Sequence, residues 1–411
     1  MYFTKTAERL LACARELDQY AAAEGFTWDS ILETRKVNED VIERRAQLLD
    51  AIHDLQHQAL GSYEALYNLL FTTTDVQSVR ALVRFNIPAN VPEGGISFQD
   101  LAARVNVDES ILARIVRMAI AQSIFCEPAP GIVDHTKLSR AMMTPDIFDT
   151  VCFMSDETQV TATFMLDALE KWPGSQEPNH TAFNLSRNTT DVFYSYLEKH
   201  PERARRAGGA FRAMNKHTLS GPADFTSSRL WQDLDVPGKL LVDVGGNMGH
   251  VSQQIAKVTK NLSFLIEDLA DTCKFGENEL AAEFHGRITF KPHDFFQDQP
   301  IKGADVYFMR MILHDWPDKY CIRILEKLVP ALKDGSKVVC CEVILPETAS
   351  PTYTDRCLRR MDLTMLAIHN ATERTETQWR QLFARVDPRF TLEFESWPHT
   401  LHGLVIATWH A

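Results

Sequence analysis

The stretch KLLVDVGGNMGHVSQQIAKV, residues 239–258, decides the fold of the second half of the chain. It predicts a β-strand, a glycine-rich turn and a helix, in that order. Glycines at 245, 246 and 249 let the backbone turn tightly and approach a ligand where a Cβ would be in the way. Such turns hold several nucleotide-like ligands, so the glycines alone do not identify the ligand.

Acidic residues near this turn narrow the range of ligands that it can bind. Asp243 comes two residues before the first glycine, where a carboxylate attracts a cation such as the aminoacyl end of S-adenosylmethionine and repels a pyrophosphate. Asp268 ends the next predicted strand, where it can accept hydrogen bonds from ribose hydroxyls. Asp294 and Phe295 close the third strand, and a carboxylate beside an aromatic ring suits an adenine. The pattern favours S-adenosyl-L-methionine as the cofactor.

The segment after residue 238 predicts an α/β fold. Short β-rich runs alternate with helical ones, which is typical of βαβ units with helices on both faces of a mostly parallel sheet. The runs are KLLVDV, LSFLIED, ITFKPHD, ADVYFMR and SKVVCCEVIL. FTLEFESW and LHGLVIATWH then follow without a helix between them. We therefore expect a Rossmann-like sheet of seven strands that ends in an antiparallel hairpin.

The first half of the chain is predicted to be mainly α-helical. Helical patterns in residues 1–85 break near Gly25 and Gly61. A turn cluster is expected over residues 88–95, and the helical region 150–225 is expected to have loops at residues 173–174 and 208–209.

Residues 97–142 have the outline of a winged helix-turn-helix. Ser97 is expected to cap the first helix, the second begins at Glu109, and a strand pair lies around Phe125 and Ile132. Such a module often binds DNA. Here the second helix is mostly apolar, which indicates packing or dimerisation instead.

Composition excludes several classes of protein. The net charge is −12, so no clustered cationic surface for nucleic acid or anionic membranes is expected. No apolar stretch is long enough to span a membrane, and the N-terminus has no secretory signal pattern. The eight cysteines include no C-x-x-C pair and suit reduced, buried thiols in a cytoplasmic protein.

With these pieces in order, the chain resembles the plant- and fungal-type small-molecule O-methyltransferases. These are class I S-adenosylmethionine-dependent enzymes with an N-terminal winged-helix dimerisation domain. The matching stretches are LVDVGGNMGH, FLIEDL, ITFKPHDFF, ADVYFMRMILHDWPD, VVCCEVILPE and MDLTMLAIHNATERTETQW. The run MILHDWPD is the most specific of them.

The resemblance implies a role for each matching position. Cofactor-binding positions are Asp243, Gly245, Gly246, Asp268, Leu269, Asp294, Phe295 and Arg310. His314 matches the catalytic base, with Glu342 and Glu373 as its flanking carboxylates. Positions that match substrate-facing side chains are Met214, His217 and Met365. The resemblance also implies a small-molecule acceptor and a homodimer, and we expect no metal.

This set of residues suits methyl transfer to a hydroxyl. The protein must position the two reactants and remove one proton. A histidine is suited because its unperturbed pKa lies near neutrality, and a carboxylate on its far nitrogen fixes the tautomer. We expect His314 after the fourth strand, Glu342 at the end of the fifth, and Asp315 as the cap of the following helix.

The layout predicts four segments. They are a helical segment 1–60, a winged-helix dimerisation domain 61–150, a helical linker and acceptor-pocket region 151–236, and a cofactor-binding domain 237–411.

The sequence departs from the family at Asn247, where a third glycine is usual. Asparagine tolerates a positive φ better than most residues, so cofactor binding can survive.

Three alternatives remain open. A pericyclase-like relative would keep S-adenosylmethionine without methylating, but such relatives often alter the histidine that this chain keeps at position 314. A nicotinamide-dependent oxidoreductase is opposed by the C-terminal hairpin and by Asp243, and a DNA-binding regulator by the acidic charge. The acceptor could be a phenol, an enol, a polyketide or an alkaloid nitrogen.

Overall fold

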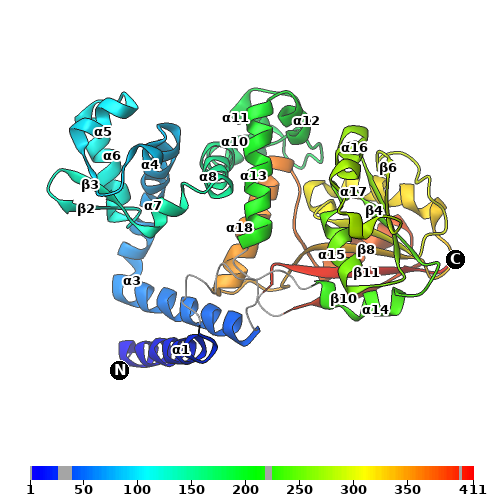
Figure 1. Cartoon of the computed structure of the whole chain (residues 1–411). Helices are drawn as coiled ribbons and strands as arrows, with labels where there is room; N and C mark the ends of the chain where they lie inside the picture. The colour runs from blue at the N-terminus through cyan, green and yellow to red at the C-terminus, as the bar shows by residue number, and fades with distance from the viewer. Residues whose placement is uncertain (1, 26–38, 218–224, 398–399) are drawn as a thin grey trace. The chain divides into compact units, whose positions relative to one another are not determined.

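A computed structural model describes residues 2–25, 39–217, 225–397 and 400–411. The chain divides into two compact units (Figure 1). Unit 1 comprises Met1–Lys36, Gln47–Ala168 and Ala182–Leu219, and unit 2 comprises Val37–Ala46, Leu169–Thr181 and Ser220–Ala411.

Unit 2 is built on one twisted sheet. Its strands are β4 (Leu240–Val244), β5 (Ser263–Asp268), β6 (Ile288–Pro292), β7 (Val306–Arg310), β8 (Lys337–Leu345), β10 (Phe390–Ser396) and β11 (His402–Trp409). The spatial order is β10-β11-β8-β7-β4-β5-β6, and the short strand β9 (Arg374–Thr375) pairs with β8 off this path. The pairs from β8 to β6 are parallel, whereas β11 is antiparallel to both neighbours. The predicted seven-stranded sheet with its terminal hairpin is confirmed.

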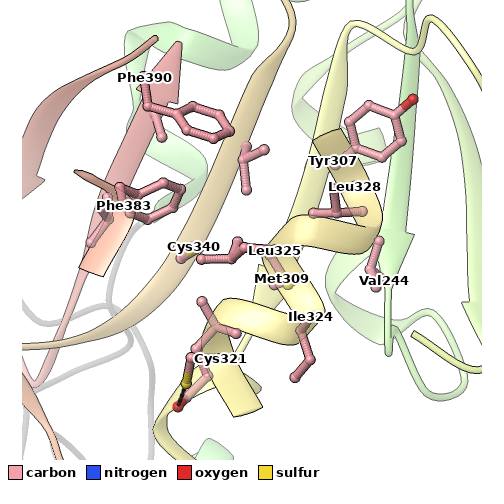
Figure 2. Packing of buried hydrophobic residues seen from close by; sticks show 14 of the residues in the cluster. Val244, Tyr307, Met309, Cys321, Ile324, Leu325, Leu328, Cys340, Phe383 and Phe390 are labelled. Atoms are coloured by element: carbon pink, nitrogen blue, oxygen red, sulfur yellow. Dashed lines mark hydrogen bonds between the residues drawn. The ribbon is translucent and has the colours of Figure 1, made fainter. Parts of the chain in front are cut away.

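Alternating side chains of the central strands supply two hydrophobic cores, one on each face. Val242, Tyr307 and Cys340 face a core that includes helices α17 (Asp318–Leu328) and α19 (Glu376–Val386). Figure 2 shows Tyr307 and Cys340 in this core, together with Leu325 and Phe383. Their neighbours Leu241 and Phe308 face a core that includes α14 (Arg229–Leu234) and α15 (His250–Val258). Because both faces are covered, the strands read as continuous apolar runs.

The remaining elements of unit 2 are short helices and α18. They are the 3-10 helices η2 (Phe225–Ser227), η3 (Ala282–Phe284), η4 (Leu313–Asp315) and η5 (Val329–Ala331), and the α-helices α16 (Ala270–Glu279) and α18 (Tyr353–His369).

Unit 1 is mainly helical and contains the predicted winged-helix outline. Ser97 caps α5 (Phe98–Val105) by accepting from the Asp100 N–H, and Asp108 caps α6 (Glu109–Ala121). The strands β1 (Ile96–Ser97), β3 (Ile132–His135) and β2 (Phe125–Ala129) form a three-stranded sheet. Leu112 and Val116 of α6 lie in a core with Leu82 of α3 (Glu39–Arg84), which is why the second helix is apolar.

The other helices of unit 1 are α1 (Tyr2–Glu24), α4 (Ile87–Asn90), α7 (Lys137–Ala141), α8 (Pro145–Cys152), α9 (Gln159–Ala162), α11 (Ala182–Arg187), α12 (Phe193–Glu198) and α13 (Pro201–His217). A π-helix, η1 (Phe153–Thr158), joins α8 to α9, and α10 (Met165–Lys171) crosses the boundary between the units. The breaks predicted near Gly25 and Gly61 are present: α1 ends just before Gly25, and α3 has a non-helical φ of 67° at Gly61.

One loop prediction in this unit is wrong, and another is correct only in part. Residues 208–209 lie inside α13, because Gly209 is needed there for close packing: a Cβ on it would lie 2.7 Å from Cβ of Asp149 in α8. The turn cluster at residues 88–95 is helical at its start, since α4 carries Pro88 in its first turn, where a missing N–H costs nothing.

All eight cysteines are free thiols, and six of them are buried. Within the described ranges, no helix combines the length and the apolar character needed to cross a membrane.

Candidate active site

The glycine turn after β4 is a close-packed cradle. The N–H groups of Gly245 and Gly246 donate to the carbonyl oxygen of Glu267, at 2.8 and 3.0 Å. A Cβ on Gly245, whose φ is +72°, would lie 2.7 Å from Cδ1 of Ile312, and a Cβ on Gly246 would lie 2.5 Å from Cγ of Asp243. Glycine is therefore required at both positions, as the sequence pattern predicts.

Asp243 lies beneath this turn, almost fully buried. Its Oδ2 accepts a hydrogen bond of 2.6 Å from the Ser252 hydroxyl. Burial raises the pKa of Asp243 to about 6, with a further upward contribution from Asp268 and an opposing one from Arg310 at the end of β7. A carboxylate with so few partners is suited to a cationic ligand.

Asp268 completes the turn from β5. Its Oδ2 accepts from the Asn247 N–H at 2.9 Å, and its Oδ1 accepts from the Leu269 N–H at 2.8 Å. Asn247 has a φ of 52°, in the left-handed region where asparagine is tolerated. Asn247 thus takes the place of the family's third glycine without loss of the turn.

Asp294 and Phe295 lie in the loop that follows β6. Oδ1 of Asp294 accepts from the Phe296 N–H at 2.9 Å. The ring of Phe295 packs against Phe296 and Trp316 and adjoins the turn, with Cε1 lying 3.8 Å from the Cβ position of Gly245. The predicted adenine-binding pair therefore lies beside the glycine turn. Its binding role stays a prediction.

The turn that carries His314 begins against the glycine cradle. Ile312, which packs on Gly245, immediately precedes η4. The N–H groups of Ile312 and Leu313 donate to Oε1 of Glu342, at 3.0 and 2.9 Å. Glu342 was expected at the end of the fifth strand, but β8 continues to Leu345 because its outer part pairs with β11 and β9.

The imidazole of His314 is buried between two carboxylates. Its Nδ1 lies 2.9 Å from Oε1 of Glu373 and its Nε2 lies 3.4 Å from Oδ1 of Asp315. Burial, the largest influence, lowers the pKa of His314, but Asp315, Glu373 and Glu342 together outweigh it and raise the pKa to about 10. Burial and the neighbouring Glu373 raise the pKa of Glu342 to about 7, although the charge of His314 opposes them.

Sequence reasoning missed the environment of Asp315. It was expected to cap α17, but the N-cap is Pro317 and has no side-chain hydrogen bond. Asp315 Oδ1 instead lies 3.4 Å from Nε2 of His369, at the end of α18, as well as from Nε2 of His314. His369 lies in the matching stretch MDLTMLAIHNATERTETQW, but the resemblance assigned it no role, and only the approach of α18 to η4 reveals its contact with Asp315.

His402, which is half-buried, is another histidine that the sequence did not single out. It begins β11, where it pairs with Val343. Burial, with contributions from the charges of Arg310 and His314, lowers the pKa of His402 to about 3, so it is neutral at physiological pH. Its position depends on the antiparallel pairing of distant strands, which no local pattern encodes.

The predicted acceptor-facing residues are only partly placed. Met365 of α18 is buried in unit 2. Met214 is half-buried in α13 of unit 1, and the side chain of His217 lies outside what the structure describes. Their role as an acceptor pocket stays a prediction. In the described ranges, no group of three or more His, Cys, Asp or Glu residues could hold a metal ion.

Comparison with known proteins identifies the family. The family model of the O-methyltransferase domain matches residues 211–386. The chain is 32% identical to the O-methyltransferase aurJ of Gibberella zeae, covering 94% of this chain and 92% of the relative. The chain belongs to the S-adenosylmethionine-dependent O-methyltransferase family. It is also 31% identical to the chlorophenol O-methyltransferase of Trichoderma longibrachiatum, covering 93% and 85% of the two chains.

Solved structures share the fold of this O-methyltransferase. OxaC, which has been solved with S-adenosylhomocysteine and oxaline, matches with a TM-score of 0.79 and 22% identity, covering 99% of this chain and 98% of the other. LepI in complex with S-adenosylmethionine matches with a TM-score of 0.75 and 20% identity, covering 98% and 100%. At these identities the likeness shows the fold alone.

Proposed function

We propose that this O-methyltransferase methylates a hydroxyl of a small aromatic, polyketide-type or alkaloid-type secondary metabolite, with His314 as the general base. The observation that carries the proposal is the buried contact of 2.9 Å between His314 Nδ1 and Glu373, on a turn that packs directly against the glycine cradle. A base and a cofactor cradle that share one packed contact can act on the same small molecule.

The two ring nitrogens of His314 have different tasks. Glu373 holds the proton on Nδ1, which leaves Nε2 to take the proton of the acceptor hydroxyl. With a pKa of about 10, the resting ring is an imidazolium held by Glu373 and Asp315. It must lose one proton before it can act, and the acceptor proton can then pass to Nε2. The strong proton affinity of the ring then suits a phenol as the acid.

The cradle residues fit S-adenosylmethionine. Asp243 would hold the cationic aminoacyl end, Asp268 with Leu269 the ribose, and Asp294 with Phe295 the adenine. When bound there, S-adenosylmethionine would supply an activated methyl group for the acceptor oxygen. A Cβ on Gly245 or Gly246 would collide with Ile312 or Asp243, so glycine at both positions keeps the turn closed over Asp243.

The acceptor class is supported by the relatives. One similar enzyme is named for chlorophenol, another for grayanic acid biosynthesis in Cladonia grayi, and OxaC was solved with oxaline and with meleagrin. Met365, Met214 and His217 are the proposed acceptor-facing residues. A pericyclic reaction enzyme shares the fold at 20% identity, so a non-methylating reaction is the alternative outcome of the test below.

We further propose a cytoplasmic homodimer that associates through α3. Its second half, after Gly61, exposes Tyr63, Leu66 and Leu70 by 77%, 64% and 73% of their surface. Large apolar side chains so exposed along one helix are typical of a surface that another protein covers. The four segments predicted from the sequence, with boundaries near residues 60, 150 and 236, are retained as the proposed functional division.

The decisive experiment combines S-adenosylmethionine with three acceptors: a chlorophenol, meleagrin and a polyketide phenol. Mass spectrometry should find the mass of one methyl group added to at least one of them. His314→Gln should lose activity by about 100-fold to 10,000-fold, as expected for a lost general base, while calorimetry finds the cofactor Kd nearly unchanged. Full activity in His314→Gln would remove the base assignment, and tight cofactor binding with every acceptor unchanged in mass would favour the pericyclase-like alternative.

A further inference from the structure

A fully buried arginine holds the carbonyl side of the turn that carries His314. Arg374 is 1% exposed and begins β9, one residue after Glu373. Its Nη1 donates to the carbonyl oxygen of Leu313 at 3.1 Å, and its Nη2 donates to the carbonyl oxygen of Trp316 at 3.2 Å. These two carbonyls lie on either side of His314 in the chain.

The guanidinium is itself anchored on its other sides. Asp318 Oδ1 accepts from Nε at 3.1 Å and from Nη2 at 2.8 Å, and the carbonyl oxygen of Thr372 accepts from Nη1 at 3.3 Å. The ring of Trp379 lies 5.3 Å from the guanidinium carbon. The buried thiol of Cys321 donates to the same carbonyls of Leu313 and Trp316, each at 3.1 Å. A planar group with several fixed donors is held in one orientation by such a set.

The turn is therefore held from both sides by charged groups of the sheet. Glu342 of β8 accepts from its N–H groups, and Arg374 of β9 donates to its carbonyls. β9 pairs with β8 through the partners Ile344 and Arg374, so both groups lie on hydrogen-bonded strands. Glu373 precedes Arg374 directly, so the contact that orients the imidazole and the contact that fixes its backbone come from adjacent residues.

We propose that Arg374 is a positioning residue for methyl transfer: it clamps the turn so that the imidazole of His314 stays against Glu373. This inference rests on the proposed role of His314 as the general base. Arg374 itself contacts neither nitrogen of the imidazole in the described residues, so it acts through the backbone of the turn.

Three variants distinguish a role in positioning His314 from a general contribution to the stability of the fold. Arg374→Lys keeps the positive charge, but one ammonium group cannot serve the carbonyls of Leu313 and Trp316 and the carboxylate of Asp318 together. Arg374→Met removes the charge and all the donors. Arg385→Lys is the matched control, because Arg385 donates to the same Asp318 at 2.9 Å from an exposed position and does not contact the turn.

The primary measurement is the titration of His314 by NMR, in protein labelled with ¹³C at histidine Cε1. The resonance is assigned by its absence from His314→Gln. In the wild type and in Arg385→Lys, the pKa of His314 should lie far above its ordinary value of 6.5. In Arg374→Lys it should fall toward 6.5, because a loosened turn weakens the contact with Glu373 while the charge is kept.

Turnover provides the second measurement, with whichever of the three acceptors is methylated. It should fall by about tenfold to 100-fold in Arg374→Lys and further in Arg374→Met, as expected for a displaced base, while the cofactor Kd stays within about twofold. If Arg374→Met does not fold, the lysine variant decides the matter. An unchanged pKa of His314 in Arg374→Lys overturns the proposal, even if melting temperature and turnover both fall, because that pattern indicates a purely structural residue.

The two proposals fail separately. Full turnover in His314→Gln removes the general base but leaves the NMR result on Arg374 standing. An unchanged pKa of His314 in Arg374→Lys refutes the positioning role of Arg374 and leaves the assignment of His314 as the base intact.

Discussion

Cδ1 of Ile312 lies 2.7 Å from the point where a Cβ on Gly245 would be. This contact joins the cofactor cradle to the turn that carries His314, two residues further along the chain. The absence of one methyl group at position 245 therefore sets how closely the glycine turn and the turn of the proposed base pack together.

Gly245→Ala should weaken cofactor binding. The new Cβ must push Ile312 aside and adopt a φ of +72°, so we expect the Kd of S-adenosylmethionine to rise by about tenfold or more in calorimetry. Gly286→Ala is the matched control, because Gly286 has a φ of +85° with nothing within 4 Å of its Cβ position. An equal rise in Kd for both variants would mean that backbone strain, and not the contact with Ile312, causes the effect.

Cofactor affinity should depend on the ionisation of Asp243. Burial raises the pKa of Asp243 to about 6, so the carboxyl group is protonated and neutral at lower pH and attracts a cation only above it. We expect the Kd of S-adenosylmethionine to fall by up to about tenfold between about pH 5 and about pH 7. Asp243→Asn should bind more weakly and show a flat profile. A slope that survives in this variant would assign the titration to another group, such as Glu267, whose pKa burial also raises to about 6.

Turnover should rise with pH above neutrality. The base acts only when deprotonated, and the pKa of His314 is about 10, so with saturating cofactor the rate should climb by up to about tenfold per pH unit above about pH 8. In this range Asp243 and Glu342, with pKa values of about 6 and 7, are already ionised and do not contribute. A polychlorinated phenol that is ionised at neutral pH needs no base and should give a flatter profile. If turnover with a phenol that is not ionised did not change with pH, this result would contradict the assignment of His314 as the base.

The apolar half of α3 should control the oligomeric state. Light scattering coupled to size exclusion should find twice the chain mass of 46.7 kDa for the wild type. Leu70→Glu places a charge in the proposed interface, and its mass should fall to that of one chain. Val258→Glu is the control, because Val258 is 51% exposed and lies in unit 2. A wild type of single-chain mass would refute the dimer.

Neighbouring glycines of α13 should respond oppositely to alanine. At Gly208 the nearest atom to a new Cβ is Nη1 of Arg212, at 3.6 Å, so Gly208→Ala should stabilise the helix by about 0.5–1 kcal/mol. At Gly209 the Cβ would collide with Asp149, which is buried and paired with Arg205 at 2.7 Å. We expect Gly209→Ala to cost about 1–3 kcal/mol. Denaturant unfolding measures both, and similar values for the pair would show that α8 and α13 yield to the added methyl.

Local patterns predicted most of the secondary structure. The caps at Ser97 and Asp108 and the strand runs of the sheet depend on neighbouring residues, so they are readable in order along the chain. Gly208 and Gly209 were misread as a loop because a glycine pair breaks helices in general. Only the crossing of α8 and α13 shows that Gly209 is there for close packing.

The candidate site also has one part that the sequence predicts and another that only the tertiary structure shows. The sequence by itself determined the family and the glycine turn at Asp243–Gly249, because the matching motifs are continuous stretches of the chain, and the resemblance to that family implied His314, Glu342 and Glu373. Only the tertiary structure decided which atoms meet. In the structure Glu342 accepts hydrogen bonds from the backbone of the turn, and the imidazole lies between Glu373 and Asp315. His369 lies near Asp315, and Arg374 donates to the carbonyl oxygen of Leu313. These contacts join strands and helices far apart in sequence, and their geometry follows from sheet pairing and packing that no local pattern contains.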